Sequence, residues 1–197
     1  MPFYVAHARE AHGAVLVAGC GAGRVLLPVA KAGADADAFD ADGAAVAAAR
    51  QALIDRGLVA EVWIADLRSF TCRRRYAGLL VSGHAFNRLR DVDEFAAALA
   101  ACRAALAPGA WIVADMAGPA APAPFAPSYH LADDLAGATT NARRWTTHEL
   151  TTHLAAAGFA GLELWGDFRE ASLTSASRDI VWRAWLSDAP RGATNHP

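Results

Sequence analysis

The sequence predicts a doubly wound α/β fold, in which helices cover both faces of a mostly parallel sheet of seven strands. Short apolar runs alternate with helix-compatible segments along the chain, a pattern typical of parallel strands joined by right-handed crossovers. The first apolar run ends in a glycine-rich turn, and polar residues follow several later runs. Ligands of such sheets bind at the carboxyl ends of the strands, so these residues mark a candidate site.

The stretch Val15–Arg24 predicts a buried strand, a tight turn and the start of a helix. Glycine permits the unusual backbone angles of such a turn and lets a ligand approach without meeting a Cβ atom. The free N–H groups at the start of a helix favour an anionic or carbonyl-like ligand group. The predicted ligand-binding residues of this turn are Gly19, Cys20, Gly21, Ala22 and Gly23.

The helices follow from apolar periodicity and from their end signals. Gly33, Gly57 and Gly158 each end one helix, Pro108-Gly109 closes another, and Asp91 is the expected N-cap of the longest. Thr146 or Thr147 is expected to cap the last helix. The predicted helices span residues 3–12, 24–32, 44–56, 91–107 and 145–157.

The strands follow from short apolar runs between these helices. Residues 34–39 are a weak strand by propensity, because alanine and aspartate are poor strand formers, and the position ahead of Asp40 supports the prediction. Prolines between residues 117 and 128 predict an extended loop. The predicted strands span residues 15–18, 34–39, 59–65, 76–81, 110–116, 162–165 and 180–186.

Composition favours one globular domain over residues 1–187, followed by a flexible tail at 188–197. The chain has 197 residues, of which 54% are hydrophobic and 19% charged, enough to bury a full core. A net charge of −2 gives no reason to expect nucleic acid as a partner.

The three cysteines have no metal-binding spacing, which predicts a reducing cytoplasm and no metal site. No apolar segment is long enough to span a bilayer.

Two acidic residues end predicted strands in register with the glycine turn. Asp40 follows the second strand, where a carboxylate can accept two hydrogen bonds from a ribose diol. Asp42 is better placed to cap the next helix. Asp66 ends the third strand, and Ser82 follows the fourth.

With these residues in place, the chain resembles the small-molecule branch of the class I S-adenosylmethionine-dependent methyltransferases. The likeness rests on the G-x-G-x-G turn and on residues 23–30, 107–110, 143–146 and 166–168, and it extends over about residues 3–185. It implies a Rossmann-like sheet with an antiparallel last strand, S-adenosyl-L-methionine as cofactor, and methyl transfer to an unidentified small-molecule nucleophile. The further cofactor-binding residues that it implies are Asp40, Ala41, Asp66, Leu67 and Ser82.

The resemblance also suggests substrate-facing residues after the fourth strand. His84 is the best candidate for a general base, and Asn87 and Arg88 lie where this branch often has polar residues facing the substrate. An equally good interpretation is that His84 only lines the cofactor loop or faces water. Methyl transfer needs alignment more than it needs a base, so the prediction does not depend on His84.

Two departures from the family leave other functions open. Val17 occupies a position that is usually acidic, and only a short helix precedes the first strand, so we expect an open cleft and weak, micromolar cofactor binding. A protein that binds S-adenosylmethionine without transferring its methyl group is therefore an alternative. A nicotinamide-dependent oxidoreductase is less favoured, because Arg24 replaces the third glycine of G-x-G-x-x-G. A homodimer is left open.

Overall fold

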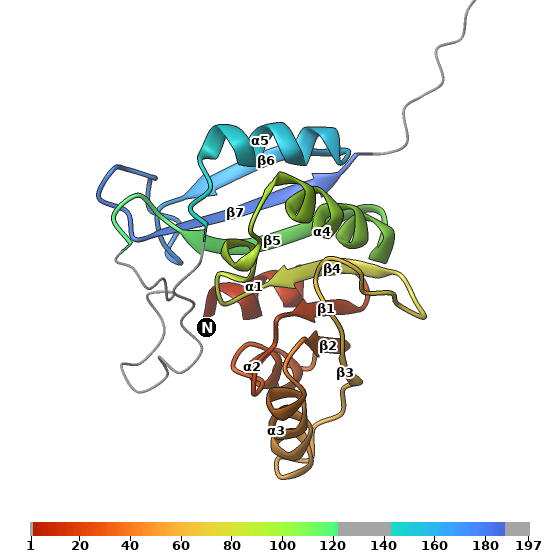
Figure 1. The fold of residues 1–197 in the computed structure, drawn as a ribbon. Coiled ribbons are helices and arrows are strands. Elements are labelled where there is room, and N and C mark those ends of the chain that lie inside the picture. Colours follow the sequence, from red (N-terminus) through yellow and green to blue (C-terminus); the bar gives the residue numbers. More distant parts are fainter. Residues whose placement is uncertain (1, 122–142, 188–197) are drawn as a thin grey trace, which may run out of the picture.

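The computed structural model describes residues 2–121 and 143–187, which form one sheet flanked by helices (Figure 1). The strands are β1 (Val15–Ala18), β2 (Ala36–Asp40), β3 (Val62–Ile64), β4 (Tyr76–Val81), β5 (Leu106–Ala117), β6 (Phe159–Trp165) and β7 (Asp179–Leu186). The helices are α1 (Pro2–Glu10), α2 (Leu26–Lys31), α3 (Gly43–Ile54), α4 (Val92–Ala105), α5 (Thr147–Ala156) and the short 3-10 helix η1 (Ala85–Arg88).

The order of the strands confirms the predicted doubly wound sheet. Within the described residues the sheet has seven strands in the order β3-β2-β1-β4-β5-β7-β6. The strands from β3 to β5 pair in parallel, whereas β7 runs antiparallel to both of its neighbours, β5 and β6. The last strand is therefore antiparallel, as the resemblance implied.

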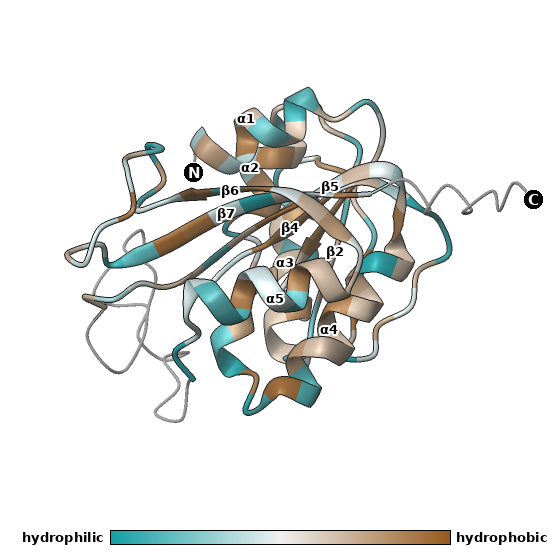
Figure 2. Ribbon diagram, turned by 90° about the horizontal axis from the view of Figure 1, so that it is seen from above, coloured by the Kyte–Doolittle hydropathy of each residue, from teal (hydrophilic) through white to brown (hydrophobic). Residues whose placement is uncertain are grey.

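Alternating side chains of the strands build two cores, one on each face of the sheet. Val15 and Val17 of β1 pack with α1, α2 and α3, whereas Leu16 and Ala18 pack with α4 and α5. Figure 2 shows α1 on one side of the sheet and α4 and α5 on the other. Because every residue of β1 is buried, this strand is fixed from both faces, and the turn that follows it has a rigid support.

Side-chain caps fix where three helices begin. The Asp42 carboxylate accepts the N–H of Ala44 at 2.8 Å, and the Asp91 carboxylate accepts the N–H of Glu94 at 2.9 Å. Thr146 and Glu149 form a capping box at the start of α5. These three N-caps were expected from the sequence, because aspartate and threonine satisfy the free N–H groups of a first turn.

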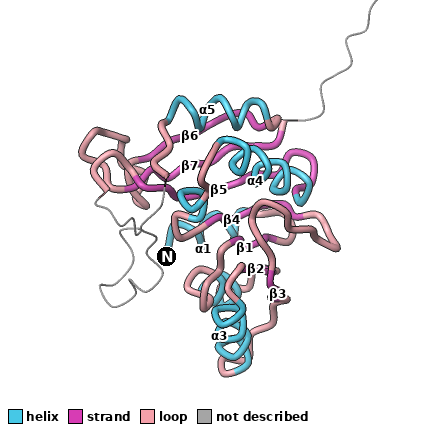
Figure 3. Tube along the Cα trace, in the orientation of Figure 1, coloured by secondary structure: helices cyan, strands magenta, loops and turns pink. Residues whose placement is uncertain are grey.

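Several boundaries differ from those predicted. The helix expected at 91–107 ends at Ala105, because β5 begins at Leu106, where it pairs with Tyr76 before the register shifts to Gly78 and Trp111. Between β4 and α4 the chain forms η1, which the sequence did not indicate (Figure 3). The predicted loop at 117–128 lies mostly outside the described residues, and the predicted tail at 188–197 lies wholly outside them.

None of the helices that the structure describes has the length and apolar character required to cross a membrane. The assignment of residues 1–187 to a single domain stays a prediction.

Candidate functional site

The turn after β1 has the geometry that its glycines predict. Gly19, Gly21 and Gly23 have φ angles of 67°, 54° and 96°, which residues with a Cβ rarely adopt. A Cβ atom added to Gly21 would meet no protein atom within 4 Å, whereas one added to Gly19 would lie 3.3 Å from the carbonyl oxygen of Ser82. The backbone at Gly21 therefore borders open space that a ligand can fill.

Asp40, at the end of β2, holds the glycine turn in place. Its Oδ2 accepts the N–H of Gly21 at 2.7 Å, and its Oδ1 accepts the N–H of Asp42 at 3.0 Å. A carboxylate has about four acceptor positions, so two remain for hydroxyl groups of a ligand. Asp40 can thus support the turn and bind a diol at the same time.

Asp66 lies after β3 in a cluster of charged side chains. Its carboxylate pairs with Arg68, whose Nε donates to Oδ1 at 2.8 Å and whose Nη2 donates to Oδ2 at 2.5 Å, and Arg68 also pairs with Glu94. The hydrogen bonds from the Arg68 side chain hold the pKa of Asp66 below its ordinary value. Asp66 is therefore an ionised acceptor in a fixed orientation.

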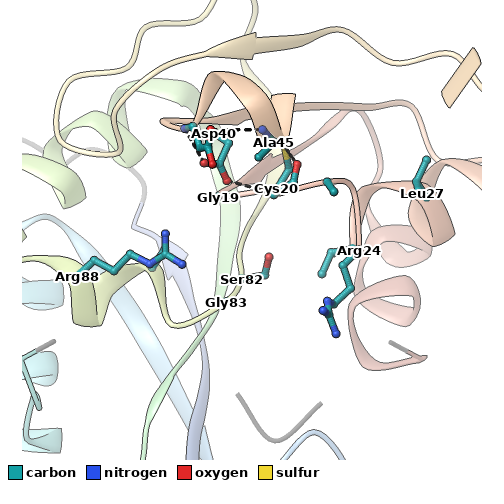
Figure 4. A pocket seen from close by; sticks show the side chains of 14 residues that line it. Gly19, Cys20, Arg24, Leu27, Asp40, Ala45, Ser82, Gly83 and Arg88 are labelled. Carbon is teal, nitrogen blue, oxygen red and sulfur yellow. Dashed lines mark hydrogen bonds between the residues drawn. The ribbon is translucent and has the colours of Figure 1, made fainter. Parts of the chain in front are cut away.

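Two adjoining cavities connect these residues at the carboxyl ends of the strands. The larger cavity has a volume of about 510 Å³ and the smaller about 170 Å³. Their combined volume lies within the usual range for small-molecule sites. Both are lined by Gly19, Asp40, Ala85 and Arg88, so they form one elongated cleft. Figure 4 shows the larger cavity.

The cleft brings together most of the residues predicted to bind the cofactor. Those that line the larger cavity are Gly19, Cys20, Gly21, Ala22, Asp40 and Ser82. Those that line the smaller cavity are Gly19, Asp40, Ala41, Asp66 and Leu67. Gly23 lines neither cavity, and a Cβ atom added there would lie 3.0 Å from Cγ of Leu27, so its role is to form the turn.

His84 lies next to this cleft but does not line either cavity. Its side chain is buried, and its Nε2 lies 3.0 Å from Oδ1 of Asp179 and 3.6 Å from Oδ2 of Asp115. Its Nδ1 is buried without a hydrogen-bond partner among the described residues. The imidazole is thus held within the protein by two acidic side chains.

Asp115, on β5, anchors the turn that contains His84. Its carboxyl group accepts the N–H of Gly83 at 3.1 Å, the N–H of His84 at 2.9 Å and the hydroxyl of Tyr4. Burial raises the pKa of Asp115, and the charge of His84 and the Tyr4 hydrogen bond oppose this rise. These bonds hold His84 in the left-handed region, at a φ of 53°.

Asn87 and Arg88 have different surroundings, although both were predicted to face the substrate. Asn87 is fully buried; its Nδ2 donates to the carbonyl of Arg143 at 2.7 Å and its Oδ1 accepts the N–H of Ala117 at 2.8 Å. Arg88 is exposed and lines both cavities. Of the two, Arg88 is the one placed to contact a ligand.

Cys20 is expected to be an unreactive thiol, although it lies in the turn. Burial and the charge of Asp40 raise its pKa to about 12, and only the thiolate is a good nucleophile. At pH 8 we expect iodoacetamide to label Cys20 in the folded chain at least about 100-fold more slowly than in denaturant, as measured by peptide mass spectrometry. Equal labelling rates in the two states would contradict this expectation.

The sequence did not single out Tyr4, Ala85, Asp115 or Asp179 as residues at the site. An aspartate inside an otherwise apolar strand was the available sign for Asp115, since a buried carboxyl group requires hydrogen-bonding partners. No group of three or more His, Cys, Asp or Glu residues is placed to hold a metal ion in the part of the chain that the structure describes.

Comparison with known proteins agrees with this geometry. Residues 15–109 match the family model described as a methyltransferase domain. No curated protein matches the chain.

Solved structures with the same fold include several methyltransferases. The CcbJ methyltransferase from Streptomyces caelestis is 18% identical, with a TM-score of 0.78 over 94% of this chain and 89% of that one. An S-adenosylmethionine-dependent methyltransferase from Clostridium acetobutylicum is 12% identical, with a TM-score of 0.79 over 94% and 90%. The glycopeptide N-methyltransferase MtfA, complexed with S-adenosyl-L-methionine, is 20% identical, with a TM-score of 0.66 over 91% and 86%. Residues 15–109 therefore match a methyltransferase domain, and the chain has the fold of these S-adenosylmethionine-dependent methyltransferases.

Proposed function

We propose that this chain binds S-adenosyl-L-methionine and transfers its methyl group to a small-molecule nucleophile. The observation that carries the proposal is the cleft, in which the glycine turn, Asp40 and Asp66 meet along two adjoining cavities. The family match supports the reaction type, and the complex of MtfA with the same cofactor supports the ligand.

The lining residues suggest how the cofactor lies. The smaller cavity, beside Asp66 and Leu67, would hold the adenine, with the amino group donating to the Asp66 carboxylate. Asp40 borders both cavities, and its two remaining acceptor positions suit the ribose hydroxyls. The rest of the molecule would then extend into the larger cavity, past Ser82.

When bound, the cofactor supplies a methyl group already activated by a sulfonium. The glycine turn, Asp40 and Asp66 would hold the cofactor, and a nucleophile bound in line with its methyl group would accept that group and give up a proton. The chain contributes alignment and exclusion of water, which together can lower a barrier by about 7–11 kcal/mol in the best intramolecular cases.

For His84 we propose a positioning role, and a catalytic role stays a prediction. Its imidazole is held by Asp179 and Asp115, and it does not line the cleft. Its backbone, however, belongs to the turn after Ser82 that borders the larger cavity. Holding this turn in the left-handed conformation shapes the cleft without contact with the reacting atoms. The cytoplasmic location and the homodimer also stay predictions.

Calorimetric titration tests the cofactor, and label transfer tests the reaction. We expect S-adenosylmethionine and S-adenosylhomocysteine to bind at one site per chain and NADH not to bind. Incubation with methyl-labelled S-adenosylmethionine and a small-molecule extract should move label into the low-mass fraction. Binding without label transfer would favour the non-catalytic alternative, and binding of NADH alone would overturn the proposal.

A further inference from the structure

The carboxylate of Asp66 is held in one orientation by Arg68, two residues further along the chain. Its Oδ1 accepts the backbone N–H of Arg68 and the Nε–H of the same residue, both at 2.8 Å, and its Oδ2 accepts a hydrogen from Nη2 at 2.5 Å. A carboxylate has about four acceptor positions, so about one remains, and it lies on Oδ2. Both residues line the smaller cavity. Asp66 therefore offers a ligand in this cavity a single acceptor at a fixed place.

Glu94, in the first turn of α4, holds the guanidinium of Arg68 from the other side. Its Oε1 accepts a hydrogen from Nη1 of Arg68 at 2.7 Å and further hydrogens from Nε and Nη2 of Arg90. Glu94 and Arg90 also line the smaller cavity. Since Nε and Nη2 of Arg68 donate to Asp66 and Nη1 donates to Glu94, the guanidinium cannot turn without breaking a charged hydrogen bond.

Stability of the fold does not account for this arrangement. The side chains of Arg68 and Asp66 are 40% and 37% exposed, and ion pairs with this exposure contribute little to folding. The network nevertheless fixes the direction of a carboxylate on the wall of a cavity. Its geometry therefore acts on what the cavity binds.

A fixed acceptor distinguishes two kinds of purine. At position six, adenine carries an amino group, which donates an N–H, whereas hypoxanthine carries an oxygen, which only accepts. Hypoxanthine has its donor on the neighbouring ring nitrogen, N1. A carboxylate that is free to turn can follow the donor from position six to N1, whereas a carboxylate held in place meets the oxygen without a hydrogen between them.

We infer that Arg68, held by Glu94, is a positioning residue that fixes the Asp66 carboxylate and so makes the site select a 6-amino purine over a 6-oxo purine. The inference rests on the proposed function, since it takes the adenine to lie in the smaller cavity. Arg68 acts through Asp66 and does not need to touch the base.

The ratio of two affinities, measured by calorimetry, tests this role. The ligands are S-adenosylhomocysteine and S-inosylhomocysteine, its 6-oxo analogue, and the unaltered chain should bind the first about 10-fold or more tightly. In Arg68→Met this ratio should fall by about 3-fold or more, because the freed carboxylate can serve either base. Arg68→Lys should restore little of it, since an ammonium lacks the planar fork. Glu94→Gln, which leaves the contact between Arg68 and Asp66 in place, should lower the ratio by a smaller factor.

The matched control is Arg73→Met, which removes an exposed arginine from the same connection between β3 and β4 and lines neither cavity of the cleft. It should leave the ratio unchanged. A ratio in Arg68→Met equal to or above that of the unaltered chain would overturn the inference, even if both ligands bind more weakly. Equal binding of the two ligands by the unaltered chain would overturn it as well and would leave the proposed function standing. If the unaltered chain binds neither ligand, the proposed function itself is wrong and the inference falls with it.

Discussion

Replacing Asp115 with alanine is expected to lower the free energy of unfolding by about 3–5 kcal/mol. The carboxyl group is fully buried and accepts hydrogen bonds from the hydroxyl of Tyr4 and from the N–H groups of Gly83 and His84. Alanine would remove the acceptor that these three donors share, and each buried donor left unsatisfied costs about 1–3 kcal/mol. The substitution also removes the link between α1 and the turn after β4.

Denaturant unfolding, followed by circular dichroism, measures this effect. Tyr4→Phe removes one of the three donors and should cost about 1 kcal/mol. The matched control is Asp55→Ala, an exposed aspartate at the end of α3, which should change stability by no more than about 0.5 kcal/mol. A loss below about 1 kcal/mol for Asp115→Ala would show that the three donors find other partners.

Replacing Asp40 with alanine is expected to reduce the affinity for S-adenosylmethionine on the order of 100-fold. Two hydroxyl hydrogen bonds to a carboxylate are lost, each contributing about 1.5–3 kcal/mol. The N–H groups of Gly21 and Asp42 also lose their acceptor, so the turn is less well fixed. Both changes act on the part of the cleft that the two cavities share.

Calorimetry on folded variants separates these contributions. Asp40→Asn keeps one acceptor oxygen and should show a smaller loss, whereas Asp93→Ala, on the exposed face of α4, should bind like the unaltered chain. A 2′-deoxyribose analogue of the cofactor should bind more weakly to the unaltered chain, and Asp40→Ala should reduce its affinity by less than that of the complete cofactor, because one of the two hydroxyl bonds is already missing. Unchanged cofactor affinity in Asp40→Ala would remove Asp40 from the site.

The local features of the fold could be predicted because local chemistry determines them. Glycines at positions 19, 21 and 23 predicted backbone angles that other residues rarely adopt, and all three have positive φ. Asp42 and Asp91 were recognised as helix caps because their side chains can accept the free N–H groups of a first turn. Even β2, with its unfavourable alanines and aspartates, was placed correctly from its position between two helices.

The cluster around His84 could not be predicted, because its members come from distant parts of the chain. Tyr4, Asp115 and Asp179 lie on α1, β5 and β7, and only the folded sheet brings them to the turn after β4. The sequence placed His84 just beyond the fourth strand, as the structure does, but could not show which way the imidazole points. The same limit applies to Asn87, whose side-chain amide forms hydrogen bonds with the backbone of Arg143 and Ala117.

A crystal structure of the chain with S-adenosylhomocysteine tests the central claim most directly. The account predicts that the adenine occupies the cavity beside Asp66 and Leu67, with both ribose hydroxyls within hydrogen-bonding distance of the Asp40 carboxylate. The amino-acid part should extend through the larger cavity, past Ser82. A ligand that lies elsewhere, or in this cleft with its ribose away from Asp40, would contradict the account.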